Sequence, residues 1–395
     1  MTARPARRGR RVAVVTGSRA EYGLLTSTMH AIEADPRLGL QLVVAGMHLL
    51  RKFGHTVDTI AHDGWQIDAR VPMQAGSDSA LDQAEGLSRG VAGIARFLET
   101  AKTNIVVVLG DRIEAMAGAL AAVTTGRILA HIHGGDVAPG DFDDSLRHAI
   151  TKLAHVHLAA TRQAARRIVR LGESPDRVYV VGAVGLDRLR ELLREADSAA
   201  KLDGRALEKE RGGKTREALV VYHAVGRPAA VEARTMRALL HAVASSGLRR
   251  LILYPNTDRG HGGVLREIER HERESVPREV RVFRSLPHDE YLRALIRADV
   301  LVGNSSSGII EAPFAGTPAV NVGPRQAGRQ PGGPSVLHVG ETCAAIRAGV
   351  QKALRLRPRP GRQNVYGEGR AGERIARILA ALPLSGEFAR KVITY

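Results

Sequence analysis

The chain has 395 residues, a formal net charge of +17, 44% hydrophobic and 25% charged residues, and one cysteine, Cys343. This length predicts two domains. No apolar run is long enough to cross a membrane. A single cysteine excludes an internal disulfide framework and fits a cytoplasmic protein. The positive charge is compatible with nucleic-acid binding, but aromatic residues make up only 4% of the chain and leave few stacking platforms. Attraction to an anionic small substrate explains part of the charge equally well.

Short runs rich in Val, Ile and Leu alternate with longer helical stretches in the first half of the chain. The predicted strands are RVAVVTGS, LQLVVAGMH, NIVVVLGD, RILAHIHGG and RVYVVGAVG, and the helical stretches include EYGLLTSTMHAIEAD and ALDQAEGLSRGVAGIARFLETAK. Apolar runs without alternation are typical of strands buried on both faces of a parallel sheet. The spacing therefore predicts successive βαβ units.

The pattern restarts after a polar break at 194–217. The strands expected there are EALVVYHAV, RRLILYPNTD, EVRVFRSLP, ADVLVGNSS, TPAVNVG and SVLHVG. The sequence thus predicts an α/β protein with two Rossmann-like, doubly wound domains that face each other across a cleft. The first covers 1–190 and is joined by the C-terminal helix at 370–395, and the second covers 191–369.

Polar motifs follow the predicted strands at the points where these end: TGSRAEYG, GDRIE, HIHGGD, YHAVGR, YPNTDRG and GNSSSG. Ligands of open α/β sheets bind outside the carboxyl ends of the strands, so these motifs are the candidate sites. The dinucleotide fingerprint G-x-G-x-x-G is missing after the first strand, which argues against NAD. HIHGGD could ligate zinc, but no H-E-x-x-H or C-x-x-C context supports a metal.

In the first domain, Arg19 follows a glycine turn and is interpreted as a phosphate ligand, with a surface turn between Arg19 and Glu21 as the alternative. Asp111 is interpreted as a catalytic acid, as the cap of the following helix, or as both. Arg112 is its candidate partner, or a ligand for a substrate anion.

The segment HIHGGDVAPGDFDDSLRHAITK collects acids and cations after a double glycine. Asp143 or Asp144 is expected to cap a helix, on which Asp144, Arg147 and Lys152 share one face. This face either lines a cavity or forms an exposed, salt-bridged stripe. The continuation AITKLAHVHLAA is interpreted as a buried part of the same helix, with His155 and His157 as packing residues.

In the second domain, His223 ends a strand and is either a structural histidine or an acid, base or phosphate ligand. The serines at 305–307 open a short helix and predict a diphosphate cradle. Glu311 is placed to accept hydrogen bonds from a ribose diol, and Arg325 to add a phosphate contact. The alternative is a serine-rich helix cap with a surface glutamate.

Together these motifs, with HIHGGD…DDS.RHAITKLAH and VGNSSSGIIEAPFAGTPAVNVGPRQAGR foremost, resemble the UDP-N-acetylglucosamine 2-epimerases, and most closely the hydrolysing branch that feeds sialic acid-type sugars. The resemblance covers roughly residues 11–380. It implies a GT-B-like fold, UDP held mainly by the second domain, no cofactor and a homo-oligomer, either a dimer or a tetramer. The implied reaction is anti-elimination of UDP to a 2-acetamidoglucal, followed by hydration to free N-acetylmannosamine.

The resemblance also implies site residues. The catalytic candidates are Asp111, His133, Asp143 and His223; the substrate-binding candidates are Arg19, Arg112, Asp136, Arg147, Asn256, Asp258, Ser305, Ser306, Glu311 and Arg325; no metal is expected.

The sequence departs from the family pattern at three positions. His133 stands where related epimerases often have Glu, Asp136 where the hydrolysing branch often has Glu, and Ala224 where Pro is common. Either His133 replaces a carboxylate as proton carrier, or Asp136 takes that duty. The changes leave open a C4- or C6-modified sugar such as UDP-diacetamido-bacillosamine. A UDP-sugar glycosyltransferase, a non-hydrolysing epimerase and a nucleic-acid-binding protein remain the alternative functions.

Overall fold

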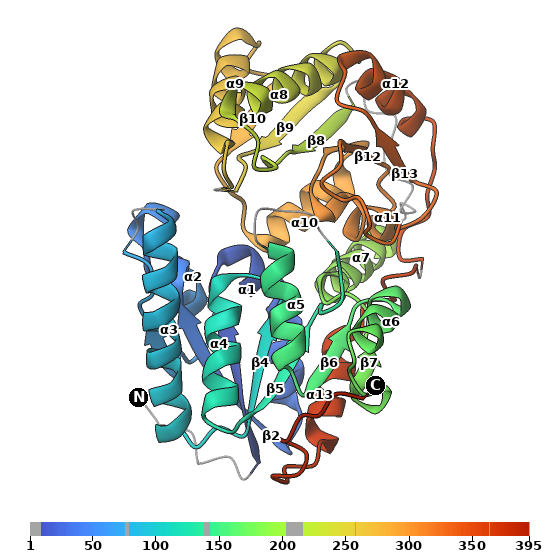
Figure 1. Cartoon of the computed structure of the whole chain (residues 1–395). Coiled ribbons are helices and arrows are strands. Elements are labelled where there is room, and N and C mark those ends of the chain that lie inside the picture. Colours follow the sequence, from blue (N-terminus) through green and yellow to red (C-terminus); the bar gives the residue numbers. More distant parts are fainter. Residues whose placement is uncertain are drawn as a thin grey trace. The chain divides into compact units, whose positions relative to one another are not determined.

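The computed structural model describes residues 9–75, 79–137, 143–202, 216–256, 258–362 and 364–394. The chain forms two compact units (Figure 1). Unit 1 comprises the described residues of Met1–Asp136, Phe142–Val184 and Arg370–Tyr395, and unit 2 those of Val137–Asp141 and Gly185–Gly369. The chain thus passes into unit 2 after Val184 and returns to unit 1 with its last helix.

Unit 1 is built on a seven-stranded parallel sheet in the order β3-β2-β1-β4-β5-β6-β7. Its strands are β1 (Arg10–Thr16), β2 (Leu38–Ala45), β3 (Ala69–Val71), β4 (Ile105–Leu109), β5 (Ile128–Ile132), β6 (Val156–Ala159) and β7 (Val178–Val180). Its helices are α1 (Arg19–Ala34), η1 (Gly46–Leu49), η2 (Arg51–Phe53), α2 (Val57–His62), α3 (Ala80–Thr100), α4 (Ile113–Thr124), α5 (Asp143–Leu153), α6 (Arg162–Arg170), η3 (Pro175–Arg177) and α13 (Ala371–Ala381).

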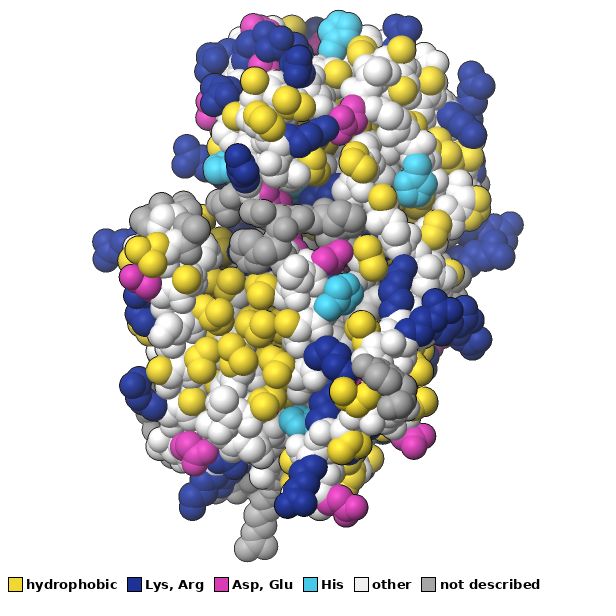
Figure 2. Space-filling model, in the orientation of Figure 1, with side chains coloured by type: hydrophobic (Ala, Val, Ile, Leu, Met, Phe, Trp, Pro, Cys, Tyr) yellow, Lys and Arg dark blue, Asp and Glu magenta, His cyan; other side chains and the backbone are white. Residues whose placement is uncertain are grey.

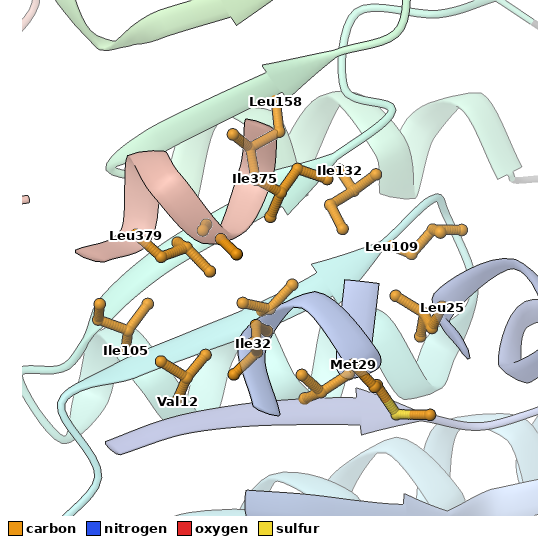
Figure 3. Close-up of a cluster of buried hydrophobic side chains, with 14 of the residues drawn as sticks. Val12, Leu25, Met29, Ile32, Ile105, Leu109, Ile132, Leu158, Ile375 and Leu379 are labelled. Carbon is orange, nitrogen blue, oxygen red and sulfur yellow. The ribbon is translucent and has the colours of Figure 1, made fainter. Parts of the chain in front are cut away.

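The central strand β1 is buried on both faces, which explains its unbroken apolar sequence. Val12 and Val14 join the core on the face covered by α1 and α13, and Figure 3 shows Ile32 and Ile375 of these helices among the buried side chains. Ala13 and Val15 join the opposite core with residues of α3 and α4. Full burial of each such Val, Leu or Ile contributes about 1.5–3 kcal/mol, so both helical layers hold the sheet in place.

Unit 2 repeats the design with a six-stranded parallel sheet in the order β10-β9-β8-β11-β12-β13. Its strands are β8 (Glu217–Val221), β9 (Arg249–Leu253), β10 (Val280–Phe283), β11 (Val300–Gly303), β12 (Ala319–Val322) and β13 (Val336–Val339). Its helices are α7 (Gly185–Leu202), α8 (Ala229–Ala244), α9 (His261–Glu274), α10 (His288–Arg297), η4 (Ser306–Gly308), α11 (Glu311–Ala315) and α12 (Cys343–Ala353).

The prediction of two doubly wound α/β halves is confirmed, and every run predicted as a strand contains one. The prediction of one long helix through AITKLAHVHLAA is wrong. Helix α5 ends at Leu153, and Val156–Ala159 forms strand β6 between β5 and β7. A short, fully buried strand carries no polar alternation, so its apolar run resembles the buried face of a helix. The short edge strand β3 was also missed.

The first part of the predicted polar break at 194–217 is helical, since α7 continues to Leu202, whereas residues 203–215 lie outside the described part of the chain. No helix among the described residues combines the length and the apolar character that a bilayer crossing needs. On the face shown in Figure 2, Lys and Arg side chains are scattered over both units instead of forming one continuous stripe.

Candidate active site

The carboxyl end of β4 carries Asp111, whose carboxylate forms an ion pair with Arg147 of α5. The Arg147 side chain is only 6% exposed, and its Nε lies 3.5 Å from Oδ1 of Asp144. Arg112 occupies the N-cap position of α4 without a side-chain capping hydrogen bond, so Asp111 lies one residue before the cap position. Arg147 thus lies between the carboxylates of Asp111 and Asp144, and the Asp111 carboxylate is a group that can accept a proton.

The interpretation of the α5 face as an exposed, salt-bridged stripe is wrong for Arg147. Lys152 does not join this cluster: its ammonium lies 2.7 Å from Glu173 and donates to the carbonyl of Leu171. Asp143 and Asp144 both lie in the first turn of α5, where carboxylates suit the helix dipole.

A tight turn after β5 presents His133 at the same edge of the sheet. His133 adopts φ +63°, a left-handed conformation that costs a non-glycine residue roughly 1–3 kcal/mol. Its carbonyl lies 3.4 Å from Nη1 of Arg147, and Asp136, which ends the turn, is 3% exposed. Backbone strain of this kind is concentrated at functional sites, so the turn is consistent with a proton carrier at position 133.

The first turn of α1, directly after the short loop that follows β1, contains a buried acid that sequence reasoning missed. Glu21 is 5% exposed and its Oε2 accepts a 2.8 Å hydrogen bond from the backbone N–H of Gly17, so the surface-turn alternative for this segment is wrong. Burial, together with the nearby carboxylate of Glu114, raises the pKa of Glu21 to about 8. Arg19 is the first residue of α1.

Glu114, the last residue of the GDRIE motif, is fully buried. It accepts a 3.0 Å hydrogen bond from the Gln74 amide, and its Oε2 lies 3.6 Å from Nε of Arg112. An ideal Cβ at Gly17 would lie 2.3 Å from Cβ of Glu114, so only glycine fits at that position. The Glu114 side chain therefore packs against Gly17 and pairs with Arg112.

In unit 2, His223 follows β8 and its hydrogen bonds fix its tautomer. Its Nδ1 accepts from the backbone N–H of Asn256 at 3.1 Å, so the ring proton is on Nε2. Burial and the repulsion from Arg325 lower the pKa of His223 to about 3. His223 is therefore a neutral donor through Nε2 at physiological pH.

Asn304, at the end of β11, is a further residue that sequence reasoning missed. Its side chain accepts from the His223 N–H at 2.7 Å and donates to the His223 carbonyl at 2.8 Å. Its own carbonyl accepts from the Gln326 amide at 2.8 Å. The only sequence signal for this contact was the asparagine in the GNSSSG motif. In the structure, its hydrogen bonds join the ends of β8 and β11.

The serine motif forms the start of a short helical segment. Ser305 caps η4 by accepting a 3.3 Å hydrogen bond from the N–H of Ser307, and Ser306 is the first residue of η4. Glu311, the first residue of α11, is only 7% exposed, so the surface-glutamate alternative is wrong. Its Oε2 has no hydrogen-bond partner in the part of the chain that the structure describes, and burial raises its pKa. An open buried acceptor of this kind suits a ligand hydroxyl.

Arg325 and Asp258, both candidates from the sequence, lie together, with Nη2 of Arg325 3.4 Å from Oδ2 of Asp258. Arg227, by contrast, is engaged by the carboxylates of Glu232 and Glu341 and has a structural role. Among the described residues no group of three or more His, Cys, Asp or Glu side chains is placed to hold a metal ion.

A family model described as UDP-N-acetylglucosamine 2-epimerase matches residues 30–380. The chain belongs to this family. A UDP-N,N'-diacetylbacillosamine 2-epimerase (hydrolyzing) from Legionella pneumophila is 32% identical over 389 residues, which is 98% of this chain and 100% of the relative. A UDP-N-acetylglucosamine 2-epimerase from Neisseria meningitidis serogroup B is 31% identical over 349 residues, which is 88% of each chain.

Solved structures of the epimerase family share the fold. The crystal structure of a UDP-GlcNAc 2-epimerase from Neisseria meningitidis bound to UDP-GlcNAc superposes with a TM-score of 0.74 at 16% identity, covering 93% of this chain and 99% of that one. The epimerase described here is thus a GT-B-like protein with two parallel-sheet α/β units, as the resemblance implied.

Proposed function

We propose that this family member is a hydrolysing UDP-sugar 2-epimerase. It converts UDP-N-acetylglucosamine, or a C4- or C6-modified analogue, into UDP and the free 2-epimeric sugar through a 2-acetamidoglucal. The observation that carries the proposal is the ion pair of half-buried Asp111 with buried Arg147 at the carboxyl edge of the unit 1 sheet. The pair supplies a carboxylate base, which a simple nucleotide-binding module does not need.

Unit 2 supplies the nucleotide-binding groups in this proposal. The Glu311 carboxylate accepts hydrogen bonds from the ribose diol, and Ser305 and Ser306 meet the diphosphate at the start of η4. Arg325, next to Asp258, adds a cation for the phosphates, and Asn256 lies beside His223. Two solved structures of relatives were described as bound to UDP-GlcNAc, which supports a UDP-sugar as the ligand class.

In the first step Asp111 removes the proton from C2 while UDP leaves from C1. The C2–H bond is weakly acidic, so departure of the leaving group has to run with or ahead of proton transfer. His223, a neutral donor through Nε2, stabilises the charge that develops on the leaving phosphate. Arg19 and Arg112 are the cations that unit 1 contributes.

In the second step water adds to C1 of the glucal and a proton reaches C2 on the face opposite to Asp111. A second proton carrier is therefore needed. His133 is proposed for this role because its strained turn lies beside Arg147. Asp136 and Asp143 are the alternative carriers.

The choice of sugar is supported from two sides. The relative with 32% identity is named for UDP-N,N'-diacetylbacillosamine and the one with 31% identity for UDP-N-acetylglucosamine. Both sugars carry the 2-acetamido group and the UDP on which the proposed chemistry depends. A cytoplasmic location and a dimeric or tetrameric state remain predictions.

The experiment is a proton and phosphorus NMR time course in deuterated water with each of these two UDP-sugars. Release of UDP together with a free 2-epimeric sugar that carries deuterium at C2 is the expected result. An intact UDP-sugar epimer as product indicates a non-hydrolysing epimerase, and retention of the C2 proton in the presence of an acceptor indicates a glycosyltransferase. No conversion of any UDP-sugar, with tight and salt-dependent DNA binding, overturns the proposal.

A further inference from the structure

His131 is a fully buried side chain of β5 to which the proposed chemistry assigns no role. Its Nε2 lies 2.8 Å from the carbonyl oxygen of Gly110, the residue immediately before Asp111. Its Nδ1 lies 3.2 Å from Oγ1 of Thr151, which is one helical turn beyond Arg147 on α5. The ring therefore connects the same two elements that the Asp111–Arg147 pair connects.

The hydrogen positions of this bridge follow from its chemistry. A carbonyl oxygen can only accept, so Nε2 of His131 carries the ring proton. Burial lowers the pKa of His131 to about 3, so Nδ1 is a bare acceptor near neutral pH. The hydroxyl proton of Thr151 faces two acceptors, Nδ1 of His131 at 3.2 Å and the carbonyl oxygen of Arg147 at 2.9 Å, so the hydroxyl links the ring to the turn of α5 that carries Arg147.

We propose that His131 is a positioning residue, which fixes the backbone of Asp111 against helix α5 so that the Asp111 carboxylate stays in register with Arg147. The inference rests on the proposed function, since it gives Asp111 its catalytic role. The contact with the Gly110 carbonyl fixes the position of the backbone just before Asp111. The contact with Thr151 fixes the position of the helical turn that carries Arg147 relative to that backbone.

Gly134 gives independent support for a role of the contact between His131 and Thr151. An ideal Cβ at position 134 would lie 2.9 Å from Nδ1 of His131 and 2.9 Å from Oγ1 of Thr151. Any side chain there would press on the hydrogen bond itself. The absence of a side chain at Gly134, the first glycine of HIHGGD, thus leaves the room that the His131–Thr151 contact needs. Gly134 lies in the turn that begins with His133.

The test compares Thr151→Val, which keeps the shape and loses the hydroxyl, with Thr151→Ser, which keeps the hydroxyl. His131→Leu removes both ends of the bridge. We expect kcat to fall roughly 10- to 100-fold in Thr151→Val and His131→Leu, the size of effect that a misplaced catalytic group produces. We expect the Kd for UDP to stay within about twofold, since unit 2 binds the nucleotide, and Thr151→Ser to restore most of kcat.

An activity-free readout separates this inference from the proposed function. The 13C resonance of the Asp111 carboxylate, assigned with Asp111→Asn, reports its pairing with Arg147. It should move in Thr151→Val and His131→Leu and stay in place in Thr151→Ser. If wild type converts no UDP-sugar, the proposed function fails while this shift still tests the bridge. An unchanged resonance in all three folded variants, or a wild-type kcat in Thr151→Val, overturns the inference.

Discussion

Asp111 and Arg147 form an ion pair although they lie 36 positions apart, one at the end of β4 and the other on α5. The pair connects the residues that follow β4 with helix α5. It places a carboxylate where we propose that the C2 proton is removed. Each member therefore has a separate and measurable role.

Asp111→Asn should abolish proton abstraction. An amide of the same shape cannot accept the C2 proton, so we expect kcat to fall by roughly 10²- to 10⁴-fold, the usual contribution of a general base. Deuterium incorporation at C2 and UDP release, followed by NMR, should be lost together. The Kd for UDP, measured by calorimetry, should change little, and a large loss of UDP affinity would contradict the assignment of Asp111 to the sugar chemistry.

Glu311→Gln should weaken nucleotide binding and leave the chemical step largely intact. Hydrogen bonds to a charged acceptor contribute roughly 1.5–3 kcal/mol, so the Kd for UDP should rise roughly 10- to 100-fold. The matched control is 2′,3′-dideoxy-UDP, which lacks the diol. Wild type and variant should bind this analogue with similar affinity, whereas an equal loss for both ligands would show that Glu311 does not contact the ribose.

The strand ends could be located from the sequence because their signals are local. The serines, His223 and Asp111 all follow unbroken apolar runs, and each of the two parallel sheets brings its own strand ends to one edge. Partners across the fold could not be located in this way. Asn304 contacts His223 across 81 positions, and nothing local in GNSSSG distinguishes a backbone clamp from a ligand-binding side chain.

Burial of Glu21 and Glu114 was the other feature that local reasoning could not reach. A glutamate in the first turn of a helix is typically an exposed residue that favours the helix dipole, and both glutamates fit that description. Their burial depends on Gly17, whose missing side chain leaves room for Glu114, and on the Gln74 amide from a loop outside the predicted motifs.

Buried neutral histidines should make the protein lose stability in mild acid. Burial lowers the pKa of His48 to about 4 and of His131 to about 3, against 6.5 for the exposed side chain. Below pH 6.5 the unfolded chain takes up protons that the folded chain does not, so the free energy of unfolding falls as pH decreases. The slope is about 1.4 kcal/mol per pH unit for each histidine until its folded pKa is reached.

Urea unfolding between pH 7.5 and 5 measures this slope. His48 bonds Thr16 at 3.1 Å and Thr56 at 2.7 Å, and His48→Gln keeps a polar group there without the ionisation. This variant should be less stable at pH 7.5 and should show a shallower decline toward pH 5. A decline as steep as that of wild type would mean that His48 is not among the groups responsible.

Lys391 should stabilise unit 1 by binding the carbonyl groups at the C-terminal end of α5. Its ammonium donates to the carbonyls of Thr151 at 3.2 Å and Ala154 at 2.8 Å and lies 2.6 Å from the buried carboxylate of Glu173. These carbonyls end α5, where a cation suits the helix dipole. Lys391→Met leaves them and Glu173 without this donor, and we expect it to cost roughly 2–4 kcal/mol.

The matched control is Lys352→Met, at an exposed position in the last turn of α12, which should change the free energy of unfolding by less than about 0.5 kcal/mol. The pH dependence gives a second check. Burial acts to raise the pKa of Glu173, but hydrogen bonds from His157, Lys152 and Lys391 outweigh it and lower the pKa to about 2. The stabilisation from this carboxylate is complete above pH 4.5 and is lost as pH falls toward 2. Lys391→Met should therefore lie closest to wild type at the acid end of that window, and a constant difference between pH 7 and pH 3 would show that the ammonium acts only on the α5 carbonyls.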